Sequence, residues 1–156
     1  MARHVAMNEK RRRVLQGAGA LAVITCVRAR AAENELPAIP ALIAFIGRRT
    51  PRFERVRLDL PRIADNGLSV SMRVVVSGPF APGPVVRRIV LFSEANPVPE
   101  MAVFEFPQPL ERIEVDTRVR LAGTQQVVAV AEMSDGALYA AATEVIVTLG
   151  GCMDGT

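Results

Sequence analysis

The stretch Ile113-Glu114-Val115-Asp116-Thr117-Arg118-Val119-Arg120-Leu121 decides the fold, because strand-forming residues alternate in it with charged ones. Successive side chains of a β-strand point to opposite faces, so a period of two places the aliphatic residues on one face and the charges on the other. A helix would distribute both kinds of side chain around its circumference. The stretch therefore predicts a strand with one face in a core and one face in water.

Six further segments have the composition of strands: residues 56–60, 70–76, 85–92, 102–106, 127–133 and 138–149. Asp135-Gly136 separates the last two and indicates a hairpin, whereas clusters of proline and glycine elsewhere predict longer loops. Residues 36–47 carry Pro40 near their start and Gly47 at their end, which is typical of a short helix. We therefore expect an all-β fold: an immunoglobulin-like antiparallel β-sandwich of about seven strands, with a short N-terminal helix and a flexible C-terminal arm.

The formal net charge of +3 is placed unevenly along the 156 residues. Residues 1–31 hold seven basic residues and one acid, which leaves twelve basic against fifteen acidic residues in the remainder. A cationic patch with Arg11 and Arg12 precedes an apolar stretch, residues 14–27, and then Ala29-Arg30-Ala31. This order is typical of a secretory signal, and the paired arginines indicate the twin-arginine route. We expect export to the periplasm.

The composition of residues 1–31 also indicates which partners to expect and where the segments of the chain begin and end. A basic arm that binds nucleic acid is the alternative to a signal, but residues 1–31 contain no interleaved aromatic residue and do contain an apolar centre, so we expect no nucleic-acid partner. No apolar run reaches about 18 residues, so no stable membrane insertion is expected. The predicted organisation is a signal peptide over 1–31, a helical segment over 32–50, a sandwich over 51–149 and a C-terminal arm over 150–156.

The residues after position 31 exclude several kinds of catalysis. The only histidine is His4 and the only lysine is Lys10, so the remainder has no Ser-His-Asp or Cys-His pair, no histidine-ligated zinc and no Schiff-base lysine. Glu114 and Asp116 share one face of a predicted strand and are the best candidates for carboxylate chemistry. We favour a solvated strand face for them. We expect no catalytic residue, no metal and no cofactor, and a chain that is not itself an enzyme.

Cys152 is the only cysteine outside the expected signal, and glycines surround it at Gly150, Gly151 and Gly155. Glycine-rich segments are flexible, and three extended residues reach roughly 10 Å. A lone cysteine in an exported protein indicates an intermolecular partner or a reactive thiol. Three interpretations stay open from the residues alone: a covalent carrier, a structural subunit with an intermolecular disulfide, and a ligand-binding sandwich whose cysteine is incidental.

Five ordered stretches resemble one family, the SoxY proteins, which are the sulfur-carrier subunits of the bacterial sulfur-oxidation (Sox) system. They are residues 58–67, 91–100, 117–125, 128–136 and 147–152. The resemblance implies that Cys152 covalently holds thiosulfate-derived sulfur and that Gly150 and Gly151 act as its hinge. It also implies a stable SoxZ-like partner in a heterodimer. Transient docking would follow with a SoxAX-like cytochrome, a SoxB-like manganese hydrolase and a SoxCD-like dehydrogenase.

The end of the chain departs from the family pattern. Arms of the family typically finish Gly-Gly-Cys-Gly-Gly, whereas Met153-Asp154-Gly155-Thr156 follow the cysteine here. Met153 adds a bulky side chain next to the carrier sulfur. Asp154 adds a negative charge, which is expected to disfavour the thiolate and to repel anionic cargo.

Overall fold

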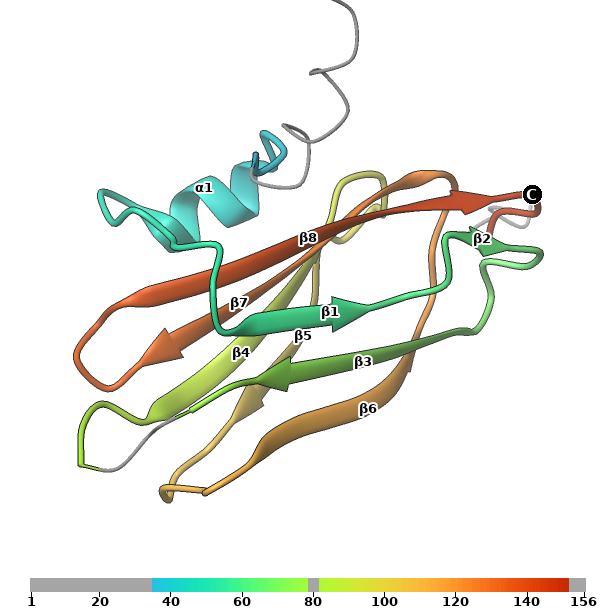
Figure 1. The fold of residues 1–156 in the computed structure, drawn as a ribbon. Coiled ribbons are helices and arrows are strands. Elements are labelled where there is room, and N and C mark those ends of the chain that lie inside the picture. Colours follow the sequence, from blue (N-terminus) through green and yellow to red (C-terminus); the bar gives the residue numbers. More distant parts are fainter. Residues whose placement is uncertain (1–34, 79–81, 152–156) are drawn as a thin grey trace, which may run out of the picture. The chain divides into compact units, whose positions relative to one another are not determined.

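The computed structural model describes residues 35–78 and 82–151. In these residues, eight strands form two sheets (Figure 1). The three-stranded sheet has the order β1 (Val56–Asp59), β3 (Val70–Val76) and β6 (Ile113–Val119). The five-stranded sheet has the order β2 (Ile63–Ala64), β8 (Leu138–Val147), β7 (Gln125–Met133), β4 (Val86–Ser93) and β5 (Glu100–Glu105). The predicted all-β sandwich is confirmed.

The main core lies between the two sheets and follows the alternation of the strands. Every second residue of β3 is buried, and Val74 at its centre is fully enclosed. From the opposite sheet, β4 contributes Ile89 and Leu91, while β7 contributes Val127 and Ala129. Burial of such aliphatic side chains supplies the main free energy that favours folding.

A second core lies on the other face of the five-stranded sheet, under α1 (Pro40–Ile46). As the sequence predicted, the helix has proline in its first turn and ends at Gly47. Gly47 has φ of 61° and donates its N–H to the carbonyl of Ile43. Leu42 is fully buried, and the ring of Phe45 lies 5.7 Å from that of Phe92 on β4. The helix thus packs on this subunit's own sheet.

This helix explains why β4 and β7 lack a polar face. α1 covers the outer face of these two strands, where Val90 and Val128 lie. Strands that are buried on both sides become continuous apolar runs. That is the pattern of residues 89–92 and 127–131, all of which are buried.

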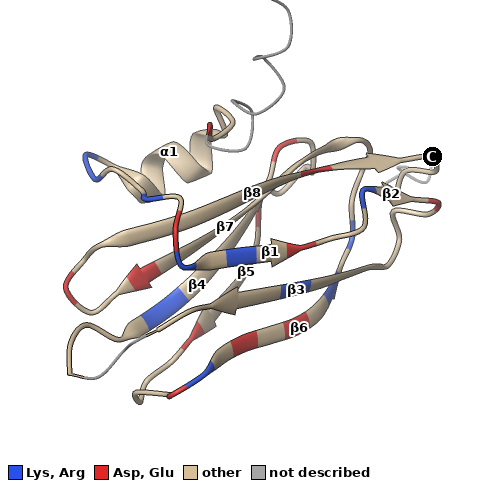
Figure 2. Ribbon diagram, in the orientation of Figure 1, with Lys and Arg blue, Asp and Glu red and all other residues tan. Residues whose placement is uncertain are grey.

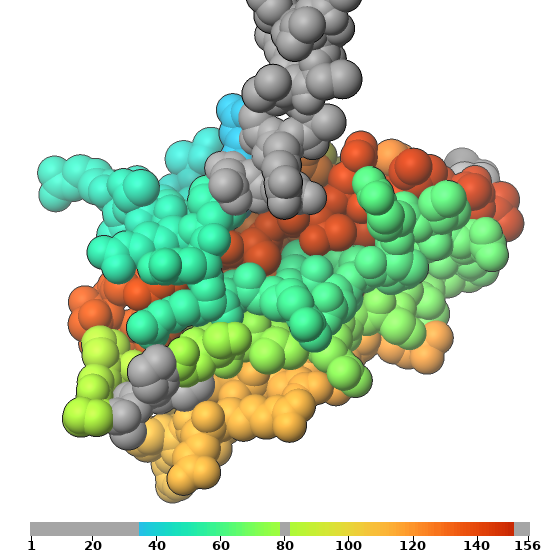
Figure 3. Space-filling view, viewed as in Figure 1, coloured from blue at the N-terminus to red at the C-terminus, as the bar shows by residue number. Residues whose placement is uncertain are grey.

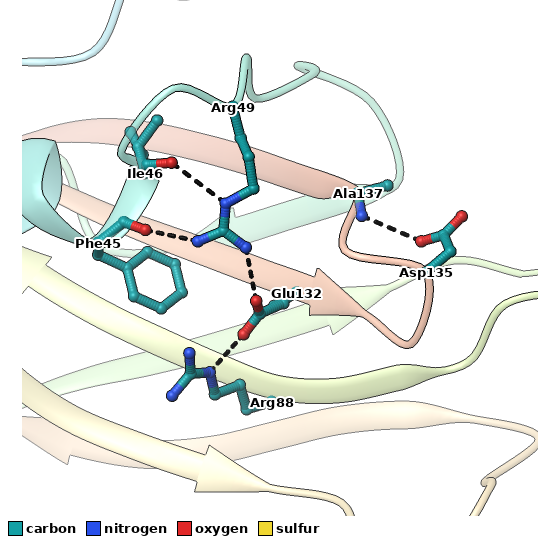
Figure 4. Close-up of polar contacts among 7 residues, drawn as sticks. All are labelled: Phe45, Ile46, Arg49, Arg88, Glu132, Asp135 and Ala137. Carbon is teal, nitrogen blue, oxygen red and sulfur yellow. Dashed lines mark hydrogen bonds and ion pairs between the residues drawn. The ribbon is translucent and has the colours of Figure 1, made fainter.

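A cluster of ion pairs among Arg49, Arg88 and Glu132 connects the end of α1 to the five-stranded sheet (Figure 4). Glu132 of β7 accepts hydrogen bonds from Arg49 and Arg88, each with an N–O distance of 2.5 Å. Arg49 also donates to the carbonyls of Phe45 and Ile46 at the end of the helix. Burial raises the pKa of Glu132, but the two arginines outweigh this effect, and its pKa lies below the ordinary value.

Charged residues occur on all three strands of the three-stranded sheet (Figure 2). On β3 and β6 they alternate with the residues that face the core. Arg73 of β3 lies opposite Asp116 of β6, with an ion-pair distance of 2.6 Å, and 3.4 Å from Glu114. Arg112 also pairs with Glu114. The two carboxylates singled out in the sequence are therefore partners of arginines on a solvated strand face, the interpretation that we favoured.

One strand was missed in the sequence. β2 has two residues, and Ile63 and Ala64 pair with Ile146 and Val147 of β8 in parallel, so the sandwich is not wholly antiparallel. A two-residue strand has no readable period, and it forms here because a distant segment of the chain offers it a partner. In the described residues, no helix is both long and apolar enough to cross a membrane.

Candidate functional site

The candidate site is the point at which the chain leaves β8 toward Cys152. Cys152 and Gly155 lie outside the described residues, as do Arg11 and Arg12 of the expected signal. Gly151 is the last described residue and directly precedes the cysteine. The residues that hold Gly151 therefore set the place from which Cys152 extends.

Three backbone hydrogen bonds join three distant segments at this point. Gly67, in the turn between β2 and β3, donates its N–H to the carbonyl of Leu149 at 2.7 Å. Leu121 donates to the carbonyl of Gly67 at 2.8 Å, and its own carbonyl accepts the N–H of Gly151 at 2.7 Å. We call Gly67, Leu121, Leu149, Gly150 and Gly151 the arm base.

The glycines of the arm base leave no space for a side chain. A Cβ atom on Gly151 would lie 2.4 Å from the carbonyl oxygen of Gly67, and one on Gly150 would lie 2.3 Å from that of Ala122. A Cβ on Gly67 would lie 2.2 Å from the oxygen of Leu121. The sequence analysis interpreted Gly150 and Gly151 as a tether. The structure shows a second reason for glycine at both positions: a neighbouring backbone lies too close for any side chain.

A network of two side-chain amides, those of Asn96 and Gln125, holds the segment that receives Gly151. The side chain of Asn96 donates to the carbonyl of Arg120 at 2.8 Å and accepts the N–H of Ala122 at 2.9 Å. Gln125, almost fully buried, donates to Asn96 at 3.1 Å and accepts the N–H of Ala95 at 2.9 Å. Because these bonds lie on both sides of Leu121, they fix the position of its carbonyl.

Hydrogen bonds from two further segments hold the backbone just before the arm base, at residues 147 and 148. Thr148 donates its N–H to the carbonyl of Ala64 at 3.0 Å and its hydroxyl to that of Asp65 at 2.7 Å. Val147 donates its N–H to the hydroxyl of Thr124 at 3.0 Å. The groups that hold the arm base are thus amides, carbonyls and hydroxyls, none of which gains or loses a proton near neutral pH. They can position the chain, but they supply no general base.

Four of the five stretches singled out in the sequence meet here. Gly67 closes the first, Asn96 lies in the second, Leu121 and Gln125 lie in the third, and Gly151 lies in the last. A family model described as "Sulfur oxidation protein SoxY" matches residues 43–152, well over half of the chain. The chain belongs to the SoxY family.

A solved SoxY structure agrees with this assignment. The sulfur carrier protein SoxY from Chlorobium limicola f thiosulfatophilum is 32% identical to this SoxY-family chain, with a TM-score of 0.58 over 70% of this chain and 94% of that one. A superoxide reductase (neelaredoxin) from Ignicoccus hospitalis has a TM-score of 0.52 at 18% identity, over 60% of this chain and 80% of that one. At that identity the likeness shows the fold alone. No functionally curated protein matches the sequence.

The sequence analysis did not identify Gly67, Asn96 and Gln125 as functional residues of this SoxY-family chain. Signals for two of them were visible, because Asn66-Gly67 and Asn96-Pro97 are turn-forming pairs. Gln125 carried no such signal, since its role depends on burial. In the part of the chain that the structure describes, no group of three His, Cys, Asp or Glu residues is placed to hold a metal.

Proposed function

We propose that this chain is a periplasmic sulfur carrier that holds thiosulfate-derived sulfur on Cys152 and presents it to partner enzymes. The observation that carries the proposal is the arm base, which anchors Gly151 immediately before the cysteine of a SoxY-family chain. The similarity to a structure described as a sulfur carrier protein supports the same role.

The chemistry of loading needs an external electron acceptor. The thiol of Cys152 and thiosulfate form a new S–S bond, giving a cysteine S-thiosulfonate, one proton and two electrons. The family resemblance assigns the electrons to a SoxAX-like c-type cytochrome. Water then cleaves the terminal S–S bond, which releases sulfate and a proton and leaves a persulfide on Cys152. The resemblance assigns this hydrolysis to a SoxB-like enzyme, and later oxidation of the remaining sulfur to a SoxCD-like dehydrogenase.

A carrier needs position rather than catalytic groups of its own. The arm base supplies amides, carbonyls and hydroxyls, and an enzyme acting on the thiol would need a base and an oxyanion site in addition. We therefore propose that partners contribute all the catalysis, and that a SoxZ-like subunit forms a stable heterodimer with this chain. Residues 1–31 would direct it to the periplasm through Arg11 and Arg12.

Intact mass of the chain from thiosulfate-oxidising cells tests this function, before and after a reductant. We expect an N-terminus near residue 32 and reductant-labile additions of sulfur or thiosulfonate on Cys152. A Cys152→Ser variant should keep its fold and its copurifying partner while thiosulfate oxidation stops. A permanent Cys152-linked dimer without sulfur additions would instead support the structural-subunit interpretation. Unchanged thiosulfate oxidation in the serine variant would exclude the carrier role.

A further inference from the structure

Exposed aliphatic side chains gather around the arm base. Nine large hydrophobic residues are exposed in the described part of the chain, and four of them lie at this one end of the sandwich. They are Ile63, Leu68, Ile146 and Leu149, with exposed fractions of 60%, 52%, 48% and 67%. We call these four residues the apolar collar.

The hydrogen bonds of the arm base bring the collar residues together. Ile63 and Ile146 are partners across β2 and β8, so their side chains lie on the same face of the sheet. Leu149 accepts the N–H of Gly67, and Leu68 is the next residue after Gly67. In the space-filling view, the end of β8 and the segment between β2 and β3 lie side by side (Figure 3).

Single exposed leucines are normal at protein surfaces, whereas several exposed aliphatic residues in one place indicate a binding surface. Exposed charged residues adjoin the collar at Arg62 and Asp65. An apolar centre with a polar surround is the composition of a protein-binding surface. The fold makes no use of these side chains, because they lie outside both hydrophobic cores.

The position of Cys152 decides which kind of partner the collar fits. Consecutive Cα atoms lie 3.8 Å apart, so the sulfur of Cys152 is within about 7 Å of the Cα of Gly151. A protein whose active site reaches that sulfur must come close to Gly151, and its surface around the active-site opening then lies against the collar.

We propose that the apolar collar is the docking surface for the partner enzymes that act on Cys152, and that these enzymes present an apolar rim around the opening that admits the arm. This inference rests on the proposed carrier function. Four side chains form a small contact, which favours brief encounters over a permanent complex. A second copy of the chain is a poorer occupant, because the edge strand β2 has only two residues and cannot template an extended sheet between copies.

The test measures loading of Cys152 in a periplasmic extract of cells that were grown in the presence of thiosulfate and from which the gene for this chain has been deleted. The purified chain with its copurifying partner is added together with thiosulfate, and mass spectrometry follows the initial rate of adduct formation. We expect Ile63→Ser and Leu149→Ser each to slow loading several-fold, and the double variant about tenfold or more. Alkylation of Cys152 by iodoacetamide, which needs no docking, should proceed at the wild-type rate in all variants.

Ile43→Ser is the matched control, since Ile43 is 56% exposed but lies on α1, and its loading rate should stay at the wild-type value. Equal loading of wild type and double variant would overturn the collar proposal while leaving the carrier function intact. Absence of any adduct on the wild-type chain would overturn both. Loss of the copurifying partner, or of a self-associated dimer, from the collar variants would assign the collar to a permanent interface and overturn the proposal. Either single variant serves if the double variant fails to fold.

Discussion

The backbone N–H of Gly151 donates to the carbonyl of Leu121 at 2.7 Å, and Gly151 is itself buried. Cys152 therefore extends from a fixed point on the sandwich. The sequence analysis counted the reach of the arm from Leu149, which gave roughly 10 Å to the cysteine. Because Gly151 is held, that count is too long, since only the residues after Gly151 lie beyond the anchored backbone.

The anchoring predicts that a methyl group at position 151 is disruptive. In Gly151→Ala the Cβ would meet the carbonyl oxygen of Gly67, so the Gly151–Leu121 hydrogen bond should break. We expect a loss of about 1–3 kcal/mol in the free energy of unfolding, measured with urea. Gly123→Ala is the control, because a Cβ at Gly123 meets nothing within 4 Å. Equal stability of the two variants would mean that Gly151 is not held as described.

The network of the Asn96 and Gln125 side-chain amides makes a second prediction. Gln125→Ala removes the buried side chain that donates to Asn96 and accepts the N–H of Ala95. We expect a cost of about 1–3 kcal/mol and faster hydrogen exchange at the amide of Gly151. Gln126→Ala serves as the comparison, since the side-chain oxygen of Gln126 accepts no hydrogen bond in the described structure. The idea fails if the Gly151 amide exchanges equally slowly in both variants.

The strands with a solvated face could be predicted from sequence almost to the residue. Val70–Val76 and Ile113–Val119 alternate because one face meets the core and the other meets water. The runs in β4 and β7 were also recognised as strands, but the reason for their continuous hydrophobicity was not. That reason is tertiary: α1 covers their second face.

Only part of the candidate site could be predicted from the sequence. The cysteine and its glycines could be singled out because a lone thiol beside glycine at the end of a strand is unusual. The contacts of Gly151 with Leu121 and Gly67 could not be foreseen, since those residues lie 30 and 84 positions away and make the contact through backbone carbonyls. A contact between backbones does not depend on the side chains, so the sequence shows it only where the close approach requires glycine.

The ion pairs of Glu132 predict acid sensitivity of the helix contact. The pKa of Glu132 is lower in the folded than in the unfolded chain, so the unfolded chain binds more protons as the pH falls. Its stabilising contribution is complete well above the ordinary pKa of 4.5 and is lost as the pH falls through the lower, folded value. Unfolding by urea at pH 7 and pH 3 should show a smaller pH dependence for Glu132→Gln than for the wild-type chain. Glu144→Gln, at an exposed position on β8, should behave like wild type. Identical pH dependence in the Glu132 variant would exclude this origin.

Asp154 predicts charge discrimination in the reactions of the Cys152 thiol. It lies two residues after Cys152, about 7 Å away in an extended chain, where two unit charges in water interact by about 0.6 kcal/mol, or about threefold in rate. Asp154→Asn should therefore react about threefold faster with a negatively charged methanethiosulfonate and about threefold slower with a positively charged one, at low ionic strength. The ratio of the two rates cancels any change in the fraction of thiolate, because both reagents attack the same species. Added salt should bring the ratio of the wild-type chain toward that of the variant. An unchanged ratio at low salt would show that the carboxylate of Asp154 does not act on charged reagents that approach Cys152.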